Sequence, residues 1–111
     1  MVYLYISIDY ISSLEFAFRK FSAELLIIDL DYNRLDGSSF GVNAFSNVKR
    51  PLRVNLNYNN IDYIDENVFK PLLKNETNSI YIYGNPLNCS DCRSFWLVKG
   101  QFNDHACFSW D

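Results

Sequence analysis

The sequence predicts an α/β fold: a solenoid with short parallel strands on its concave face and irregular or helical segments on its convex side. Two observations predict this fold class. An eleven-residue aliphatic pattern recurs with its asparagine at positions 33, 59 and 85, once every 26 residues. The segments between the copies also carry spaced apolar residues, so each copy can pack against the next.

The first copy of the pattern, over residues 4–11, is imperfect. Leu4, Ile6 and Ile11 fill aliphatic positions, but Asp9 occupies the position that asparagine holds in the later copies. An ionised carboxylate accepts hydrogen bonds and cannot donate them. We therefore expect this coil to be an imperfect or terminal one.

The next three copies are more complete. The stretch "LLIIDLDYNRL", residues 25–35, fills every fixed position of L-x-x-L-x-L-x-x-N-x-L. The stretches "PLRVNLNYNNI", residues 51–61, and "TNSIYIYGNPL", residues 77–87, repeat it in phase. Residues 1–87 are therefore predicted to form about four coils.

Each copy is expected to begin with a short strand, because its alternating aliphatic residues turn inward and their neighbours turn outward. The chain must then turn sharply, and a side-chain amide there can both donate to and accept from backbone groups of adjacent coils. The predicted structural ladder consists of Asp9, Asn33, Asn59 and Asn85.

Apolar residues recur in the spacers that follow the asparagine position, and we expect them to lie in the core. These residues are Ile11, Leu14, Phe18, Phe21, Phe40, Phe45, Ile61, Ile64, Phe69 and Leu72.

The eleven-residue pattern resembles that of the leucine-rich repeat family, whose repeats span roughly 20 to 29 residues. The resemblance covers the four copies between residues 4 and 87. It implies a parallel sheet on the concave face, with function on the outward strand positions.

After the last copy, "NPLNCSDC" and the pair Trp96-Leu97 resemble the C-terminal cap of extracellular leucine-rich repeat proteins. That cap has the pattern N-P-x-x-C-x-C, then W-L and later cysteines; here two residues separate the first cysteines. The resemblance implies a small helical cap over residues 88–111, with Trp96 over the open end. It also implies a disulfide between Cys89 and Cys107, with Cys92 left open, in a cap that is truncated or of a smaller three-cysteine type.

A zinc site is the competing interpretation of the same cysteines. Cys89, Cys92, His105 and Cys107 are the right residue types, and C-x-x-C is a usual knuckle. The second pair, however, is His-x-Cys, which is tighter than the usual ligand spacing. A thioredoxin-like redox role would need a neighbouring βαβ pattern, which the sequence lacks. We therefore predict no metal.

Composition disfavours two function classes. The net charge is -3 and no run of Lys and Arg exceeds two residues, so the electrostatic footprint of a nucleic-acid-binding protein is missing. The chain has one histidine and none of the nucleophile-elbow, P-loop or H-E-x-x-H motifs, so we predict no catalytic residues, no enzyme activity and no cofactor.

The cysteine count and two glycosylation sequons favour an extracellular protein. Three cysteines are an odd number, and N-x-S/T sequons occur at Asn75 and Asn88. The first residues show neither a signal peptide nor a membrane-spanning segment, so no membrane insertion is expected and Met1 is interpreted as an internal residue of a longer chain.

The outward strand positions are the predicted binding surface. Tyrosines beside Asp and Asn offer large contact area and hydrogen bonds at low entropy cost, which suits a protein or peptide partner with basic groups. The candidate partner-binding residues are Tyr5, Asp29, Asp31, Arg53, Asn55, Asn57, Tyr81 and Tyr83.

The aromatic-rich copies and short cysteine cap are most similar to arthropod secreted leucine-rich proteins, including those similar to the non-catalytic subunit of a luciferin monooxygenase. That resemblance implies a secreted, non-enzymatic scaffold. Two alternatives stay open: the ectodomain of a membrane receptor or adhesion protein, as in Slit-like or Toll-like families, and a cytosolic regulatory protein with three free thiols.

Overall fold

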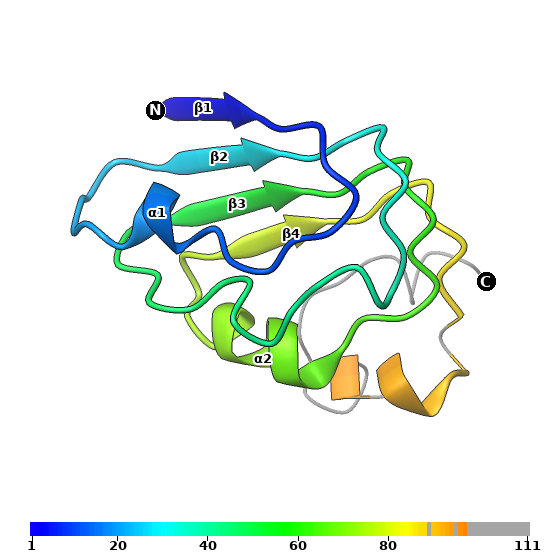
Figure 1. Cartoon of the computed structure of the whole chain (residues 1–111). Helices are drawn as coiled ribbons and strands as arrows, with labels where there is room; N and C mark the ends of the chain where they lie inside the picture. The colour runs from blue at the N-terminus through cyan, green and yellow to red at the C-terminus, as the bar shows by residue number, and fades with distance from the viewer. Residues whose placement is uncertain (89, 95, 98–111) are drawn as a thin grey trace.

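The computed structural model describes residues 1–88, 90–94 and 96–97, and its centre is one sheet of four parallel strands (Figure 1). Adjacent strands in the sheet are consecutive in the sequence, in the order β1-β2-β3-β4. Their bounds are β1 Val2–Tyr5, β2 Leu26–Asp29, β3 Leu52–Asn55 and β4 Ser79–Tyr81. The predicted α/β class with short parallel strands is confirmed.

The strand register follows the phase of the sequence pattern. Leu4 pairs with Ile28, Ile28 with Val54, and Val54 with Ile80. Aliphatic residues at these positions therefore form one continuous row, as the alternation predicts.

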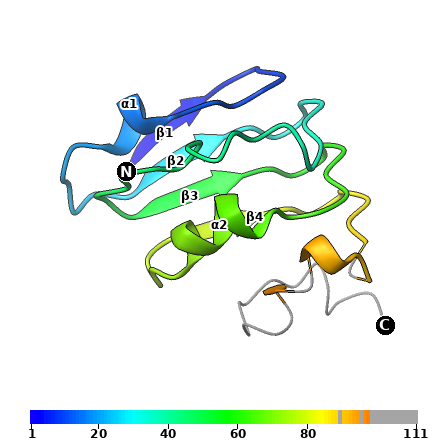
Figure 2. The same ribbon diagram turned by 60° about the horizontal axis from the view of Figure 1, so that its bottom comes forward.

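Three return segments, residues 6–25, 30–51 and 56–78, connect the strands and lie together on one side of the sheet (Figures 1 and 2). The first contains α1, Glu15–Phe18, and the third contains α2, Glu66–Leu73. The second consists of turns and irregular chain, with one β-bridge from Phe40 to Ile11. Asp65 caps α2, because its side chain accepts a hydrogen bond from the Asn67 N–H at 2.9 Å.

The core lies between the sheet and the return segments. Strand residues such as Ile28 and Val54 are wholly buried there. Phe40, Phe45 and Phe69 meet them from the other side, with ring centroids 5.1 to 6.3 Å apart. Edge-on and tilted aromatic contacts of this kind fill the layer between neighbouring return segments.

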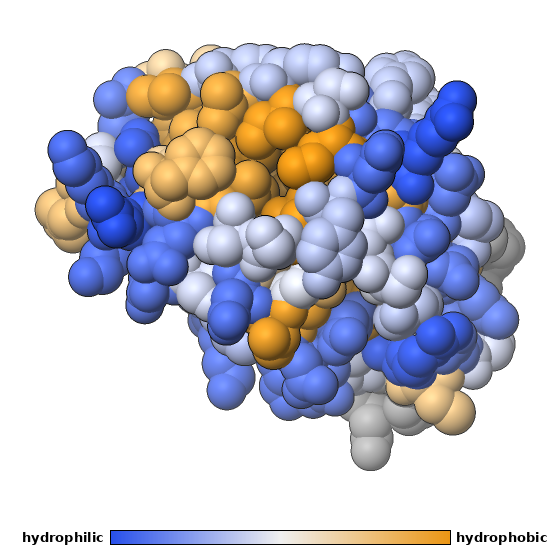
Figure 3. Space-filling model, viewed as in Figure 1, coloured by the Kyte–Doolittle hydropathy of each residue, from blue (hydrophilic) through white to orange (hydrophobic). Residues whose placement is uncertain are grey.

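The prediction for one spacer residue is wrong. Phe21 was expected in the core but is 86% exposed, whereas Phe18 is buried. Phe21 lies in the turn between α1 and β2, in the segment that follows the edge strand β1 and has a neighbour on one side only. Hydrophobic side chains are visible at the surface where β1, β2 and α1 lie (Figure 3).

The asparagine positions form the expected ladder of hydrogen bonds. The Asn59 amide donates to the carbonyls of Leu30 and Leu56, at 3.0 and 3.1 Å, and its Oδ1 accepts from the Leu35 N–H at 3.0 Å. Asn85 makes the equivalent bonds one copy later. Asn33 makes the equivalent donor bonds, to the carbonyls of Ile6 and Leu30, but its Oδ1 accepts from the Ile8 N–H instead of the Ile11 N–H. Each amide therefore connects its own turn to the preceding copy.

Asp9, the predicted first member of the ladder, differs from the others. Its side chain is exposed, and it makes no hydrogen bond to any residue that the structure describes. In the described part of the chain, β1 is an edge strand, so the turn that contains Asp9 has no preceding copy to bond to there.

Trp96 and Leu97 are buried in the core next to the last copies. The Trp96 indole N–H donates to the Ile64 carbonyl at 2.7 Å, and the Ser94 hydroxyl accepts from the Ile64 N–H at 3.0 Å. A short 3-10 helix, η1 (Cys92–Ser94), leads into this contact. Trp96 thus packs against the main body, and its assignment to a cap stays a prediction.

Candidate functional site

The predicted partner-binding residues of the strands lie in register on one face of the sheet, which we call the outer face. Tyr5 pairs with Asp29, Asp29 with Asn55, and Asn55 with Tyr81. Arg53 lies in the adjacent row, between Ile27 and Ser79. Side chains at these positions point away from the aliphatic row and so away from the return segments.

Exposure varies along the central row. Tyr5 and Tyr81, on the two edge strands, are 56% and 46% exposed, whereas Asp29 and Asn55 are only 8% and 7% exposed. Outward orientation therefore does not make the side chains of the inner strands accessible to solvent. Their side chains have neighbours on both sides, and large tyrosines stand at each end of the row.

Asp31 and Asn57 belong to a second ladder of hydrogen bonds. Asp31 Oδ1 accepts from the Asn57 N–H at 2.7 Å, and Asn57 Oδ1 accepts from the Tyr83 N–H at 2.8 Å. The Asp31 N–H in turn donates to Asp29 Oδ1 at 3.0 Å. Both side chains therefore stabilise the strand ends in addition to lying on the predicted surface.

The carboxyl group of Asp31 has a raised pKa. Burial is the main cause, and the nearby Asp29 charge adds to it, while the hydrogen bond from Asn57 acts in the opposite direction. The raised pKa therefore reflects the partial burial of this carboxyl group more than the charge of its neighbour.

Arg53 and Asn55 each keep a polar atom that is buried without a hydrogen-bond partner in the described residues. These atoms are Arg53 Nε, a donor, and Asn55 Oδ1, an acceptor. The Arg53 guanidinium lies over the Tyr81 ring, 4.8 Å from its centroid, in a cation–π contact.

Three tyrosines form an aromatic column where the strands end. The rings of Tyr32 and Tyr58 are stacked with centroids 4.8 Å apart and an interplanar angle of 11°, and Tyr83 meets Tyr58 edge-on at 5.6 Å. Tyr32 and Tyr83 are largely exposed. The column extends the tyrosine surface beyond the strands.

The two sequons are both at the surface. Asn75 lies in the turn after α2, where its Oδ1 accepts from the N–H and hydroxyl of Thr77 at 3.0 and 2.8 Å. Asn88 is exposed as well, and its Oδ1 accepts from the Ser90 N–H. Glycosylation at either position stays a prediction.

Of the residues in the disulfide and zinc interpretations, only Cys92 is among those described, and it is an exposed free thiol. Cys89, His105 and Cys107 lie outside the described residues. Among the residues that are described, no group of three or more His, Cys, Asp or Glu side chains is arranged to hold a metal ion.

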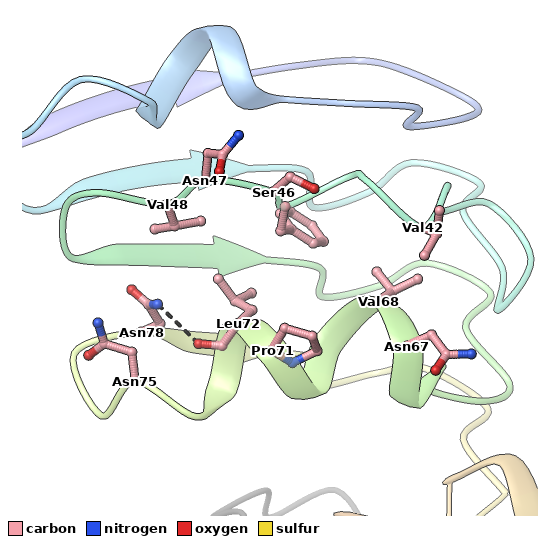
Figure 4. A pocket seen from close by; sticks show the side chains of 11 residues that line it. Val42, Ser46, Asn47, Val48, Asn67, Val68, Pro71, Leu72, Asn75 and Asn78 are labelled. Carbon is pink, nitrogen blue, oxygen red and sulfur yellow. Dashed lines mark hydrogen bonds between the residues drawn. The ribbon is translucent and has the colours of Figure 1, made fainter.

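The sequence reasoning did not identify Asn78 as a bridging residue. It is buried, its Oδ1 accepts from the Leu52 N–H at 3.1 Å, and its amide donates to the Leu72 carbonyl at 3.0 Å (Figure 4). No asparagine recurs 26 residues earlier, where Leu52 stands, so periodicity gave no signal for it.

A hollow of about 450 Å³ lies between the second return segment and α2, on the side away from the outer face (Figure 4). Apolar and amide side chains line it, and none of them is a predicted partner-binding residue. They are Val42, Phe45, Ser46, Asn47, Val48, Asn67, Val68, Pro71, Leu72, Asn75 and Asn78.

No helix in the described part of the chain has the length and apolar character needed to cross a membrane. Comparisons with known proteins found no family model that matches the chain, and no curated protein or solved structure with significant similarity to it.

Proposed function

We propose that this chain is a leucine-rich repeat solenoid that acts as a non-enzymatic scaffold and binds a protein or peptide partner on its outer face. The observation that carries the proposal is the register that places Tyr5, Asp29, Asn55 and Tyr81 in one row. Exposed tyrosines next to hydrogen-bonding side chains are typical of protein-binding surfaces.

The ladder supports the repeat assignment. Asn33, Asn59 and Asn85 each satisfy backbone groups of their own copy and of the preceding one. Such bonds connect neighbouring units only, as stacking of repeats requires.

We also propose that the protein acts outside the cell. The exposed sequon asparagines Asn75 and Asn88 and the cap-like position of Trp96 favour this location. Mass spectrometry of the chain from a eukaryotic secretory system, with and without reduction, tests the proposal. A glycan at Asn75 and a disulfide are expected; the absence of both would contradict it.

Selection from a displayed library of random 12-residue peptides tests the binding function. Binders of the unmodified chain should bind the double variant Tyr81→Ala/Tyr83→Ala at least about tenfold more weakly, because aromatic anchors carry a large share of interface energy. The change leaves the main chain intact, including the Tyr83 N–H that bonds to Asn57.

The double variant Phe16→Ala/Phe21→Ala is the matched control. These aromatic residues are at least as exposed as the two tyrosines but lie in the first return segment. Binders that lose affinity for the control, or that keep full affinity for the tyrosine variant, would place binding elsewhere and refute the proposal.

A further inference from the structure

Asn55 is the most unusual polar residue of the outer face. Its side chain is 7% exposed, and its Oδ1 is buried without a partner among the described residues. A buried acceptor without a partner destabilises a folded protein, and the tyrosines of this face can bind a partner without it. Such an atom indicates a ligand that donates a hydrogen bond.

Two acidic side chains lie near this acceptor. Asp29 pairs with Asn55 across the sheet, and strands in a sheet are about 4.8 Å apart. Asp29 is itself nearly buried, and Asp31 lies two positions further along the same face. One oxygen of each carboxylate accepts a backbone N–H, and neither side chain forms an ion pair with a described residue.

Arg53 contributes the complementary donor. Its Nε has no hydrogen-bond partner among the described residues, and its guanidinium is held over Tyr81 rather than by a carboxylate. One residue of an extended peptide presents an N–H and a carbonyl to the same side. An extended peptide along β3 therefore has a carbonyl that can accept from Arg53 Nε, and Asn55 Oδ1 stays available for a side-chain donor.

We propose that the outer face binds an extended peptide segment whose Lys or Arg side chain is held by Asp29 and Asn55, with a peptide carbonyl accepting from Arg53. The proposal rests on the proposed function and names its ligand. The Arg53 side chain, which is partly exposed, rotates from the Tyr81 ring when the peptide binds. Tyr5 and Tyr81 then flank the bound cation.

The peptides selected for binding to the unmodified chain provide the first readout. Peptides that require Tyr81 and Tyr83 should share a basic residue. In one such synthetic peptide, replacement of that residue by norleucine should weaken binding roughly tenfold or more in calorimetry, because the norleucine side chain leaves Asp29 without its cation.

Two variants of the chain provide the second readout. Asp29→Asn keeps the acceptor for the Asp31 N–H and removes the charge, and Asn55→Leu removes the acceptor. Each variant should bind the basic peptide roughly tenfold more weakly than the unmodified chain does, while its affinity for the norleucine peptide should be unchanged. Glu76→Gln is the control for loss of one negative charge, because Glu76 is exposed in the turn before β4, and it should have less than a twofold effect.

The outcomes separate the two proposals. This inference would be overturned, and the scaffold function would stand, if the peptides that require Tyr81 and Tyr83 carry no basic residue. The same holds if the Asp29→Asn chain binds them as tightly as the unmodified chain. Peptides that bind independently of Tyr81 and Tyr83, or no enriched peptides at all, would overturn both. If Asn55→Leu does not fold, the Asp29→Asn result and the norleucine peptide still decide.

Discussion

Asn59 shows why the turn after each strand needs an amide. Its Nδ2 donates to the buried carbonyls of Leu30 and Leu56 and to the partly buried carbonyl of Asn57, and its Oδ1 accepts the buried Leu35 N–H. A carboxylate could replace only the acceptor, and an apolar side chain could replace neither. Asp9, at the equivalent position of the first copy, is exposed and has no such task.

We predict that Asn59→Ala lowers the free energy of unfolding by about 1 to 3 kcal/mol, because it leaves the Leu35 N–H buried without its partner. The carbonyls of Leu30 and Leu56 each lose one donor but keep the amide of Asn33 or Asn85. Urea denaturation measures the change. Asp9→Ala is the matched control and should change stability by less than about 0.5 kcal/mol. Equal effects of the two changes would contradict the ladder's role.

Asp31→Asn should stabilise the protein at neutral pH. The raised pKa of Asp31, caused mainly by burial, means that the folded chain binds this proton more tightly than the unfolded chain. The carboxylate therefore costs stability as the pH rises through the folded pKa, and costs nothing below the unfolded pKa. An asparagine keeps the acceptor for the Asn57 N–H. The gain should be less than about 1 kcal/mol, because solvent screens a partly buried group.

Chemical denaturation across the acidic range measures this dependence. The difference between Asp31→Asn and the unmodified chain should disappear at pH values below the ordinary range of carboxyl groups. Asn57→Asp, the converse change one copy later, should be destabilising at neutral pH. A destabilising effect of Asp31→Asn at pH 7 would contradict the assignment of burial as the dominant cause.

Each turn between a strand and its ladder asparagine depends on one residue with a left-handed backbone. Tyr32, Tyr58 and Gly84, which precede Asn33, Asn59 and Asn85, have φ values of 60°, 58° and 75°. Tyrosine is strained in this conformation and glycine is not. The stacking of Tyr32 on Tyr58 offsets part of that strain.

We predict that Gly84→Ala lowers stability by about 1 to 2 kcal/mol. An alanine at position 84 would have an unfavourable backbone φ, and its Cβ would lie 2.6 Å from the Tyr58 ring. A double-mutant cycle with Tyr58→Ala separates the two causes: removal of the ring should reduce the cost but not abolish it. A cost that vanishes with the ring would exclude backbone strain as a cause.

The sequence predicted the strands well because two periods agree, the alternation within each strand and the 26-residue spacing between copies. Together they placed Asp29, Asn55 and Tyr81 in one row, as the register shows. The sequence alone could not predict that Asp29 and Asn55 are nearly buried, because burial on an open face depends on the size of the side chains that other strands contribute. The second ladder had a visible signal, since Asp31 and Asn57 recur with the same spacing.

At the scale of the whole molecule, the two ends of the sheet are finished differently. Beyond β4, Ser94 and Trp96 satisfy both backbone groups of Ile64, and Leu97 is buried. At the other end, β1 is an edge strand with exposed apolar side chains such as Val2 and Tyr3. The described part of the chain is thus covered at one end only.

Trp96→Ala should lower the free energy of unfolding by about 3 to 5 kcal/mol, the usual cost of truncating a large buried aromatic residue. Trp96→Phe should cost less, because it keeps most of the packing and loses the hydrogen bond to the Ile64 carbonyl. Denaturation followed by circular dichroism compares them. A loss of less than about 1 kcal/mol for Trp96→Ala would show that the contact between Trp96 and Ile64 contributes little to stability.

The register has a consequence for insertions and deletions. The spacing between paired residues is 24 from Leu4 to Ile28 but 26 from Ile28 to Val54, although the strands align equally well. The two-residue difference is absorbed in the return segments, which range from turns to an eight-residue helix. Evolution can therefore lengthen or shorten the chain in those segments, while the stretch from each strand to its asparagine keeps a constant length.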